Sequence, residues 1–274
     1  MFYHRKGMYT NMKNKVRKTL LIPGAATLCL GMFSCTALAG ESTAVAHQAQ
    51  GAVTIDGDLS EWDLSSPIEI KDESQVIRDA EHWLGETDVS SSVYLMWDEE
   101  NLYLAVDAKE ATPFGAVGQL AHNMEDNFKL YISTNPDADP DRTAYETNDF
   151  LVYLMMDKTN WYTAIDRSMI ERENLARFST QGMEGSDKVL QGYERTYTIT
   201  DEGFIFEAVI PWANFSNDYI EAYVPTAGDT VNFDFCMTDN DYPFPNTQAS
   251  VQISWSGSAE SDKNPSVWGR VTFE

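Results

Sequence analysis

Three aspartates alternate along the segment NPDADPDRTAYETND, which spans residues 135–149. They are Asp137, Asp139 and Asp141, and alternating carboxylates are the hard oxygen ligands that calcium prefers. The segment is not an EF-hand, because Arg142 stands where the loop needs glycine and Asn148 stands where it needs glutamate. We therefore take these three aspartates as candidate calcium ligands, with a solvated acidic turn as the alternative.

The segment DNDYPFPN (239–246) combines acids, an amide and aromatic rings directly after a predicted strand. Carboxylates, amides and aromatic rings are the side chains that can hold a polar ligand in a cleft. Asp239, Asn240 and Tyr242 are therefore candidates for the lining of a ligand cleft. A proline-rich turn without a ligand is the alternative.

Residues typical of enzyme centres are sparse. The three histidines beyond residue 39 are His47, His82 and His122, and they are scattered along the chain. The sequence has no H-E-x-x-H motif, no G-x-S-x-G motif, no phosphate-binding glycine loop and no C-x-x-C-H motif. The 43 acidic residues offer many possible carboxylate pairs, but so many acids are more typical of a solvated surface. The sequence makes no positive case for an enzyme.

The elements that would position these residues are β-strands. Apolar residues alternate with polar ones from Val53 onward, in short runs separated by acidic or Gly/Pro turns. The segment 92–110 predicts two strands joined by an acidic turn at 98–101. Further strands are expected at 127–134, 149–157, 203–210, 230–237, 250–256 and 267–273, and around WYTAID and KVLQGYERTYTIT. Long helical periodicity is absent. The pattern predicts an all-β protein, a single antiparallel β-sandwich of jelly-roll or immunoglobulin-like type with about ten strands.

The first 39 residues differ from the rest of the chain. They contain six basic residues and no acid, then an apolar run that ends in Ala37-Leu38-Ala39. This pattern predicts a secretory signal peptide at 1–39, followed by a flexible leader at 40–50 and the sandwich at 51–274. The expected location is secreted or periplasmic. A transmembrane anchor is one alternative, and a lipoprotein signal that attaches Cys35 to a membrane is another.

Charge and cysteine content limit the partners. Removal of the predicted signal peptide takes the formal net charge from −24 to −30, which repels phosphate backbones and excludes nucleic acid as a partner.

Cys236 is then the single remaining cysteine, so the fold depends on burial rather than on a disulfide. In the strand TVNFDFCM, Cys236 alternates away from the apolar core face and has no histidine near it in sequence, so it is not expected to be a nucleophile. The oligomeric state is left open.

Several motifs occur in one order along the chain: IDGDLSEWD, VYLMWDEENLYLAVDAKE, EDNFKLYIST, FIFEAVIPWANF, GDTVNFDFCMTDND and NPSVWGRVTF. Together they cover about 220 residues, and the ordered set resembles the family 9 carbohydrate-binding modules and related secreted sugar-binding β-sandwiches. The resemblance implies a calcium-containing β-sandwich that binds polysaccharides or oligosaccharides without cleaving them.

The resemblance also divides the tryptophans into structural residues and sugar-binding candidates. Four of them fall in motifs that imply structural packing: Trp62, Trp97, Trp212 and Trp268. The sugar-binding candidates are then Trp83, Trp161 and Trp255. Trp255, in QISWSG, falls where the family places one of two tryptophans that enclose the sugar.

The second aromatic wall of the family has no counterpart, because GAVGQLAHNMED contains no tryptophan. His122 and Met124 are the nearest residues, and Trp83 is the alternative. Lys129 replaces a sugar-binding glutamate of the family and is a further sugar-binding candidate, and Tyr153 lies near the position of the family's arginine.

The sequence thus predicts a secreted, non-catalytic carbohydrate-binding protein that stacks a glycan on Trp255 and a second aromatic residue, with calcium supporting the loops. One alternative is a haem-binding sandwich with Met155, Met156 or Lys129 as an axial ligand. A second is a polysaccharide-degrading enzyme with an unidentified acid pair. A third is an adhesion module for a protein partner.

Overall fold

The computed structural model describes residues 42–111, 126–155, 160–162, 169–171, 175–177, 187–216, 219–240 and 250–274, without the side chains of residues 155–189. Residues 40–274 form one compact unit. The helical segments among the described residues are three-residue 3-10 turns: η1 (Glu73–Gln75), η2 (Ala80–His82), η4 (Trp212–Asn214) and η5 (Pro265–Val267). None of the described helices is long and apolar enough to cross a membrane.

One antiparallel sheet, here the first sheet, is built around the long strand β14 (Thr230–Asp239). On one side β14 pairs with β6 (Asn127–Ser133), which pairs with β7 (Asp149–Met155). On its other side, β14 pairs with two strands. Its residues 230–233 pair with β16 (Gly269–Phe273), and its residues 236–239 pair with β15 (Val251–Ser254). Strand β15 in turn pairs with β3 (Val76–Arg78).

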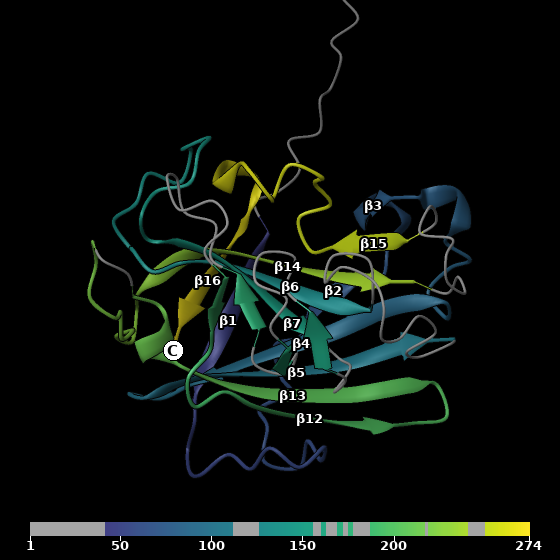
Figure 1. The fold of residues 1–274 in the computed structure, drawn as a ribbon, viewed down its shortest axis with the longest axis horizontal. Helices are drawn as coiled ribbons and strands as arrows, with labels where there is room; N and C mark the ends of the chain where they lie inside the picture. The colour runs from purple at the N-terminus through teal and green to yellow at the C-terminus, as the bar shows by residue number, and fades with distance from the viewer. Residues whose placement is uncertain are drawn as a thin grey trace, which may run out of the picture. The chain divides into compact units, whose positions relative to one another are not determined.

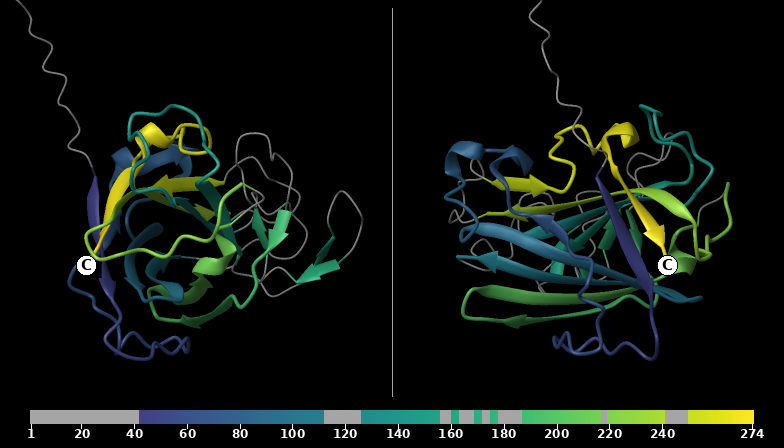
Figure 2. Two further views of the ribbon diagram at one scale, coloured as in Figure 1. Left: turned by 90° about the vertical axis from the view of Figure 1, so that its left-hand side faces the viewer. Right: turned by 180° about the vertical axis from the view of Figure 1, so that it is seen from behind.

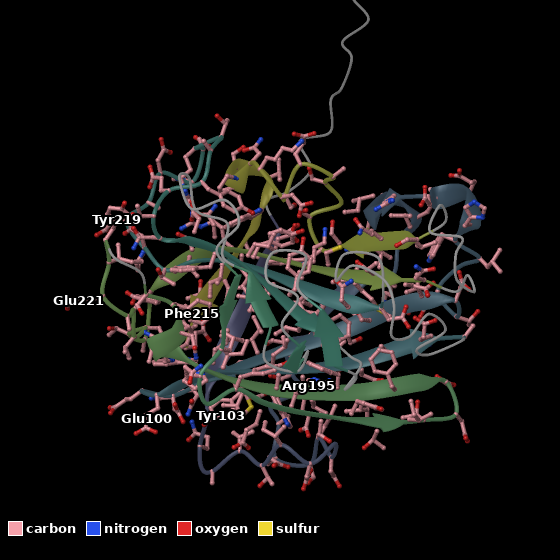
Figure 3. All side chains as sticks on the ribbon, in the orientation of Figure 1. Glu100, Tyr103, Arg195, Phe215, Tyr219 and Glu221 are labelled. Carbon is pink, nitrogen blue, oxygen red and sulfur yellow. The ribbon has the colours of Figure 1, made fainter. Side chains whose placement is uncertain are left out.

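The second antiparallel sheet has the order β12-β13-β5-β4-β2. Its strands are β2 (Ile68–Ile70), β4 (Val89–Trp97), β5 (Asn101–Glu110), β12 (Glu194–Ile199) and β13 (Gly203–Pro211). The predicted hairpin is present, and Asp98 closes its turn by accepting hydrogen bonds from the backbone N–H of Glu100 and Asn101. Tyr103 donates its hydroxyl to Asp98 at 2.7 Å, and Figure 3 shows Tyr103 near Glu100 at this corner.

Strand β1 (Thr43–Gln48) joins the two sheets. It runs parallel to β16 through residues 43–46 and parallel to β4 through residues 47–48, so the layers continue into one another as a curled sheet (Figures 1 and 2). The assignment of residues 40–50 to a flexible leader is therefore wrong for residues 43–48. Ala46 is fully buried, because small side chains allow β1 to fit in the seam between the sheets.

Two further strand pairs complete the described elements. Strand β8 (Asn160–Tyr162) pairs with β9 (Met169–Glu171), and β10 (Leu175–Arg177) pairs with β11 (Asp187–Val189). The prediction of an all-β sandwich is confirmed. The parallel pairing of β1 with both of its neighbours is the departure from a purely antiparallel arrangement.

The core lies between the inner faces of the two sheets. In β14 the side chains of Val231, Phe233, Phe235 and Met237 all point into it, as the alternation predicts. Aromatic rings dominate its centre, where Phe128 contacts the ring of Phe206 at 5.1 Å between ring centres. The four tryptophans with predicted structural roles are buried: Trp62, Trp97, Trp212 and Trp268.

Trp62 covers the outer face of the second sheet. It packs on Met96, Tyr103 and Ala105, and its indole N–H donates to Glu207 at 2.6 Å. Glu207 also accepts hydrogen bonds from the backbone N–H of Asp56 and Gly57. The opening turn is thereby anchored to β13 through one buried carboxylate.

Candidate functional site

A row of polar side chains crosses the outer face of the first sheet. In register, Arg78 of β3 lies opposite Gln252 of β15, Gln252 opposite Thr238 of β14, and Thr238 opposite Asn127 of β6. Neighbouring strands are about 4.8 Å apart, so the row is roughly 14 Å long. We call these four residues the outer polar row.

The row offers a guanidinium group, two amides and a hydroxyl. Gln252 donates its amide to Thr238 at 3.3 Å. Arg78 is exposed at the edge and lies 3.5 Å from the carboxylate of Asp79, whereas the other three members are buried. These groups both donate and accept hydrogen bonds in fixed positions, as recognition of a polyhydroxyl ligand requires.

Two predicted site residues, Asp239 and Asn240, lie at the end of β14 directly after Thr238, and Asp239, which pairs with Val251, belongs to the inner face by alternation. Both are buried, and the backbone N–H of Asn240 donates to Asp126 at 2.8 Å. Across the sheet, the backbone N–H of Ser250 donates to Asp79 at 3.0 Å. Carboxylates and an amide therefore gather where β6, β14 and β15 begin or end.

Trp83 follows η2, the short turn that contacts β15. Its indole N–H donates to the carbonyl of Val89 at 3.0 Å, and its partly buried ring packs against the core. This hydrogen bond orients the ring and leaves part of it accessible. Among the predicted aromatic residues with described side chains, Trp83 is the one that adjoins the start of β15 and therefore the strand ends around Asp239.

Trp255 directly follows β15 at its other end. Its ring is partly buried and meets the core residue Phe233 edge-on, with 6.2 Å between ring centres. It also lies against Gly269, where a Cβ atom would approach the indole to 2.5 Å. Trp255 thus packs at the edge of the core, and the length of β15 separates it from Trp83.

Lys129 is buried on the outer face of β6 and forms an ion pair with Asp262 at 3.3 Å. Its ammonium also lies 5.8 Å from the ring centre of Tyr153 on the paired strand β7. Burial acts to lower the pKa of Lys129, but Cys236, Asp262 and Tyr153 outweigh it and raise that pKa. Lys129 therefore stays charged and is held by the protein.

Residues 255–268, here the covering segment, lie over this central part of the outer face. Tyr131 donates its hydroxyl to Asp262 at 2.6 Å, and Tyr145 and Trp268 both donate to the carbonyl of Ser261. The polar groups under the covering segment are thus used to hold it in place. The outer polar row lies two residues beyond Lys129, toward the start of β6.

Asp234 anchors the same segment from β14. It is fully buried and accepts hydrogen bonds from the hydroxyls of Ser256 and Ser261, each at 2.6 Å, and from the backbone N–H of Ser256 at 3.0 Å. Burial raises the pKa of Asp234 to about 6, although these hydrogen bonds act to lower it. Cys236 is also buried on this face, and burial raises its pKa to about 12.

The three candidate calcium ligands Asp137, Asp139 and Asp141 are exposed on the loop between β6 and β7. A carboxylate oxygen of Asp139 accepts the backbone N–H of Asp141 at 3.0 Å, and Asn135 accepts that of Asp137 at 3.1 Å. Across the described ranges, no three His, Cys, Asp or Glu side chains are grouped so as to hold a metal. Calcium binding stays a prediction.

Several predicted site residues fall outside the described residues. These are Tyr242, His122, Met124 and Met156. Trp161 lies in β8 and Met155 ends β7, but their side chains are outside the described set as well.

The outer polar row contains four residues that the sequence reasoning did not select. Three of them alternate with core residues along their strands, as Gln252 does between Val251 and Ile253, and this alternation is visible in the sequence. Arg78 instead lies opposite Gln252 through a register shift between β3 and β15, which the sequence does not show. The sequence of each strand does not show that β3, β15, β14 and β6 lie next to one another in the sheet.

The chain matches the family described as "Carbohydrate family 9 binding domain-like" over residues 55–274. Among solved structures it is similar to a family 9 carbohydrate-binding module from Caldicellulosiruptor kristjanssonii in complex with cellotriose. The identity is 14%, the TM-score is 0.54, and 85% of this chain and 94% of the other are covered. The same bacterium's module in complex with glucose matches with 14% identity, a TM-score of 0.52, and coverage of 83% and 94%. No curated protein matches the chain.

Proposed function

The chain belongs to the carbohydrate family 9 binding domain-like family, and on that premise we propose that it binds a neutral polysaccharide or oligosaccharide without cleaving it. The observation that carries the proposal is the family match over residues 55–274, which includes nearly the whole described sandwich. The formal net charge of −24 favours an uncharged glycan, because an acidic surface repels polyanions.

The ligand site that we propose is the outer polar row together with the strand ends at Asp239 and Asn240. Fixed amides, a hydroxyl and carboxylates match the donor and acceptor pattern of sugar hydroxyls. Their burial supports selectivity, since a buried polar group left without its partner costs about 1–3 kcal/mol. Trp83 and Trp255 pack against the core side of the same sheet, and their accessible parts would supply aromatic surfaces at its edge.

The acids of the covered outer face support binding rather than cleavage. Asp234 is held by two serine hydroxyls and a backbone N–H, and Asp262 is held by Lys129 and Tyr131. A general acid or base must be within reach of the bond that it attacks. These two carboxylates are instead committed to the covering segment.

Export and calcium binding complete the proposal. The basic and apolar residues 1–39 support secretion or transfer to the periplasm, with attachment through Cys35 as the lipid-anchored alternative. The alternating aspartates at 137, 139 and 141 support calcium as an accessory ion that holds a loop. Sequencing the N-terminus of the exported protein tests the cleavage site after Ala39.

Affinity gel electrophoresis tests the binding function. The purified protein is run through gels that contain soluble neutral polysaccharides, one class in each gel, with and without calcium. We expect one glycan class to retard the protein relative to a gel without polysaccharide. The same gel analysed for shortened chains reports cleavage. Release of products would contradict the non-catalytic part of the proposal, and the absence of retardation on every gel would contradict the binding part.

A further inference from the structure

The outer face of the second sheet has two halves that differ in composition. In one half, Trp62 and the opening turn cover Met96, Tyr103 and Ala105. In the other half, the outward residues of β4 and β5 are Ser90, Ser92, Asp107 and Lys109. In register, Ser90 lies opposite Lys109 and Ser92 lies opposite Asp107. This half is lined almost entirely by hydrogen-bonding groups.

Longer side chains stand around these four residues and make a trough. A cavity of about 310 Å³ at the end of β5 and a smaller one of about 80 Å³ over β4 share Lys109 and Glu202 in their linings. Glu69 and Lys71 border the smaller cavity on the β2 side, and Glu86 borders it at the turn before β4. We call the set formed by Ser90, Ser92, Asp107, Lys109 and these bordering residues the serine trough.

The serine trough is held in shape by its own contacts. Lys109 lies 3.4 Å from Glu86 and 4.0 Å from Glu202, and Lys71 lies 3.2 Å from Glu69. Ser92 donates its hydroxyl to Glu69 at 3.2 Å. These exposed ion pairs contribute little to stability. Their effect is to fix donors and acceptors of both kinds along one polar surface.

An aromatic ring lies at one end of the trough. Tyr94 follows Ser92 on the same outward face of β4, and it is partly exposed. Burial, Asp107 and Glu69 raise the pKa of Tyr94. A partly exposed aromatic ring beside carboxylates, hydroxyls and ammonium groups is a combination suited to sugar rings. Carboxylates outnumber lysines in the trough, which excludes anionic ligands.

We infer that the serine trough is a second saccharide-contact surface, on the opposite sheet from the outer polar row. The inference rests on the proposed function for the class of ligand, but its residues and its face of the sandwich are different. Two surfaces on opposite sheets allow one protein molecule to hold two glycan segments. Holding two segments raises the apparent affinity for a polysaccharide without new contacts at either surface.

Chemical-shift mapping of the isotope-labelled protein tests the inference. Cellotriose and glucose, the ligands of the two similar structures, serve as probes, and calcium chloride alone serves as the cation control. We expect two separate groups of backbone amides to shift on adding cellotriose. One group lies around residues 238–240 and 252, and the other around residues 90–94 and 107–109.

Two variants assign the groups. Asp107→Ala is expected to reduce the saccharide-induced shifts at residues 90–94 at least fivefold and to leave those at residue 252 unchanged. Asn240→Ala is expected to give the reverse pattern. Unperturbed amide spectra of both variants without ligand confirm their fold. A variant with a disturbed spectrum is replaced by Ser92→Val in the trough or Gln252→Ala in the row.

The outcomes separate the two claims. Saccharide shifts confined to residues 238–240 and 252 would overturn the second surface and keep the proposed function. Trough shifts with calcium alone would identify a cation site and would also overturn the inference. If neither sugar shifts either group of amides, the inference is overturned. If, in addition, no polysaccharide gel retards the protein, the proposed function is overturned as well.

Discussion

The ammonium of Lys129 and the carboxylate of Asp262 are joined across 133 residues of sequence by an ion pair of 3.3 Å. Lys129 is buried on β6, whereas Asp262 is about half exposed and belongs to the covering segment. The pair ties that segment to the outer face of the first sheet. In the family resemblance, Lys129 stands where relatives carry a sugar-binding glutamate. In this protein its ammonium instead binds a carboxylate of the same chain.

Asp262→Asn should lower the free energy of unfolding by about 2 kcal/mol, because it leaves the buried ammonium of Lys129 without its counter-charge. The exposure of Asp262 keeps the loss below that of a fully buried pair. Urea unfolding measures the change. The matched control is Glu99→Gln, an exposed acid in the turn after β4, which should change stability by less than about 0.5 kcal/mol. Equal stability of the two variants would show that the pair does not hold the segment.

Asp234 should make the protein relatively more stable at acid pH. Burial raises its pKa from 3.8 to about 6 in the folded state. A raised carboxyl pKa gives stability that is present below about pH 4 and lost as the pH rises through about 6. The difference between these pKa values corresponds to about 3 kcal/mol.

The measurement for Asp234 compares the wild type with Asp234→Asn, so that the other acids cancel. The stability of the wild type minus that of the variant should fall by about 2.4 kcal/mol between pH 4 and pH 7. A difference that is constant or rises with pH would mean that Asp234 ionises as easily in the folded protein as in the unfolded chain.

Trp255 should affect both stability and binding. Trp255→Ala removes the edge contact with Phe233 and should lower the free energy of unfolding by about 2 kcal/mol. It should also weaken glycan affinity about tenfold, because a stacking surface is lost. Trp255→Phe keeps a ring at the core edge and should lose less of both. Unchanged affinity in a folded Trp255→Ala variant would exclude Trp255 from the site.

Cys236 should be inert in the folded protein. It is fully buried, and its pKa of about 12 leaves almost no thiolate at neutral pH. Iodoacetamide at pH 8 should therefore label it only in denaturant, as followed by intact mass. Rapid labelling under native conditions would show that the outer face opens at this strand.

The strands were the most predictable part of the fold. Alternation along β14 correctly placed Phe233 and Phe235 in the core and Cys236 on the other face. Strand β1 was missed, because TAVAHQ is short and rich in small residues. Its place depends on parallel pairing with β16 and β4, which come from distant parts of the sequence.

The site was less predictable for the same physical reason. Asp239 and Asn240 were proposed from their composition, and they follow Thr238 at the end of β14. Arg78 and Gln252 were not identified, because their proximity depends on the pairing of β3 with β15, which are separated by most of the chain. Trp255 resembles a stacking residue in sequence, but its contact with Phe233 becomes visible only in the folded sandwich.

Titration calorimetry of the outer polar row tests the central claim most directly. The wild type and Gln252→Ala are titrated with an oligosaccharide of the class that retards the protein on gels, and Gln50→Ala, an exposed glutamine outside the row, is the control. The account predicts that the wild type and the control bind alike. Gln252→Ala should bind at least tenfold more weakly while its circular dichroism spectrum matches that of the wild type, since it keeps the fold but loses a buried hydrogen-bonding group. Equal affinity of all three proteins would contradict the claim that the outer polar row holds the glycan.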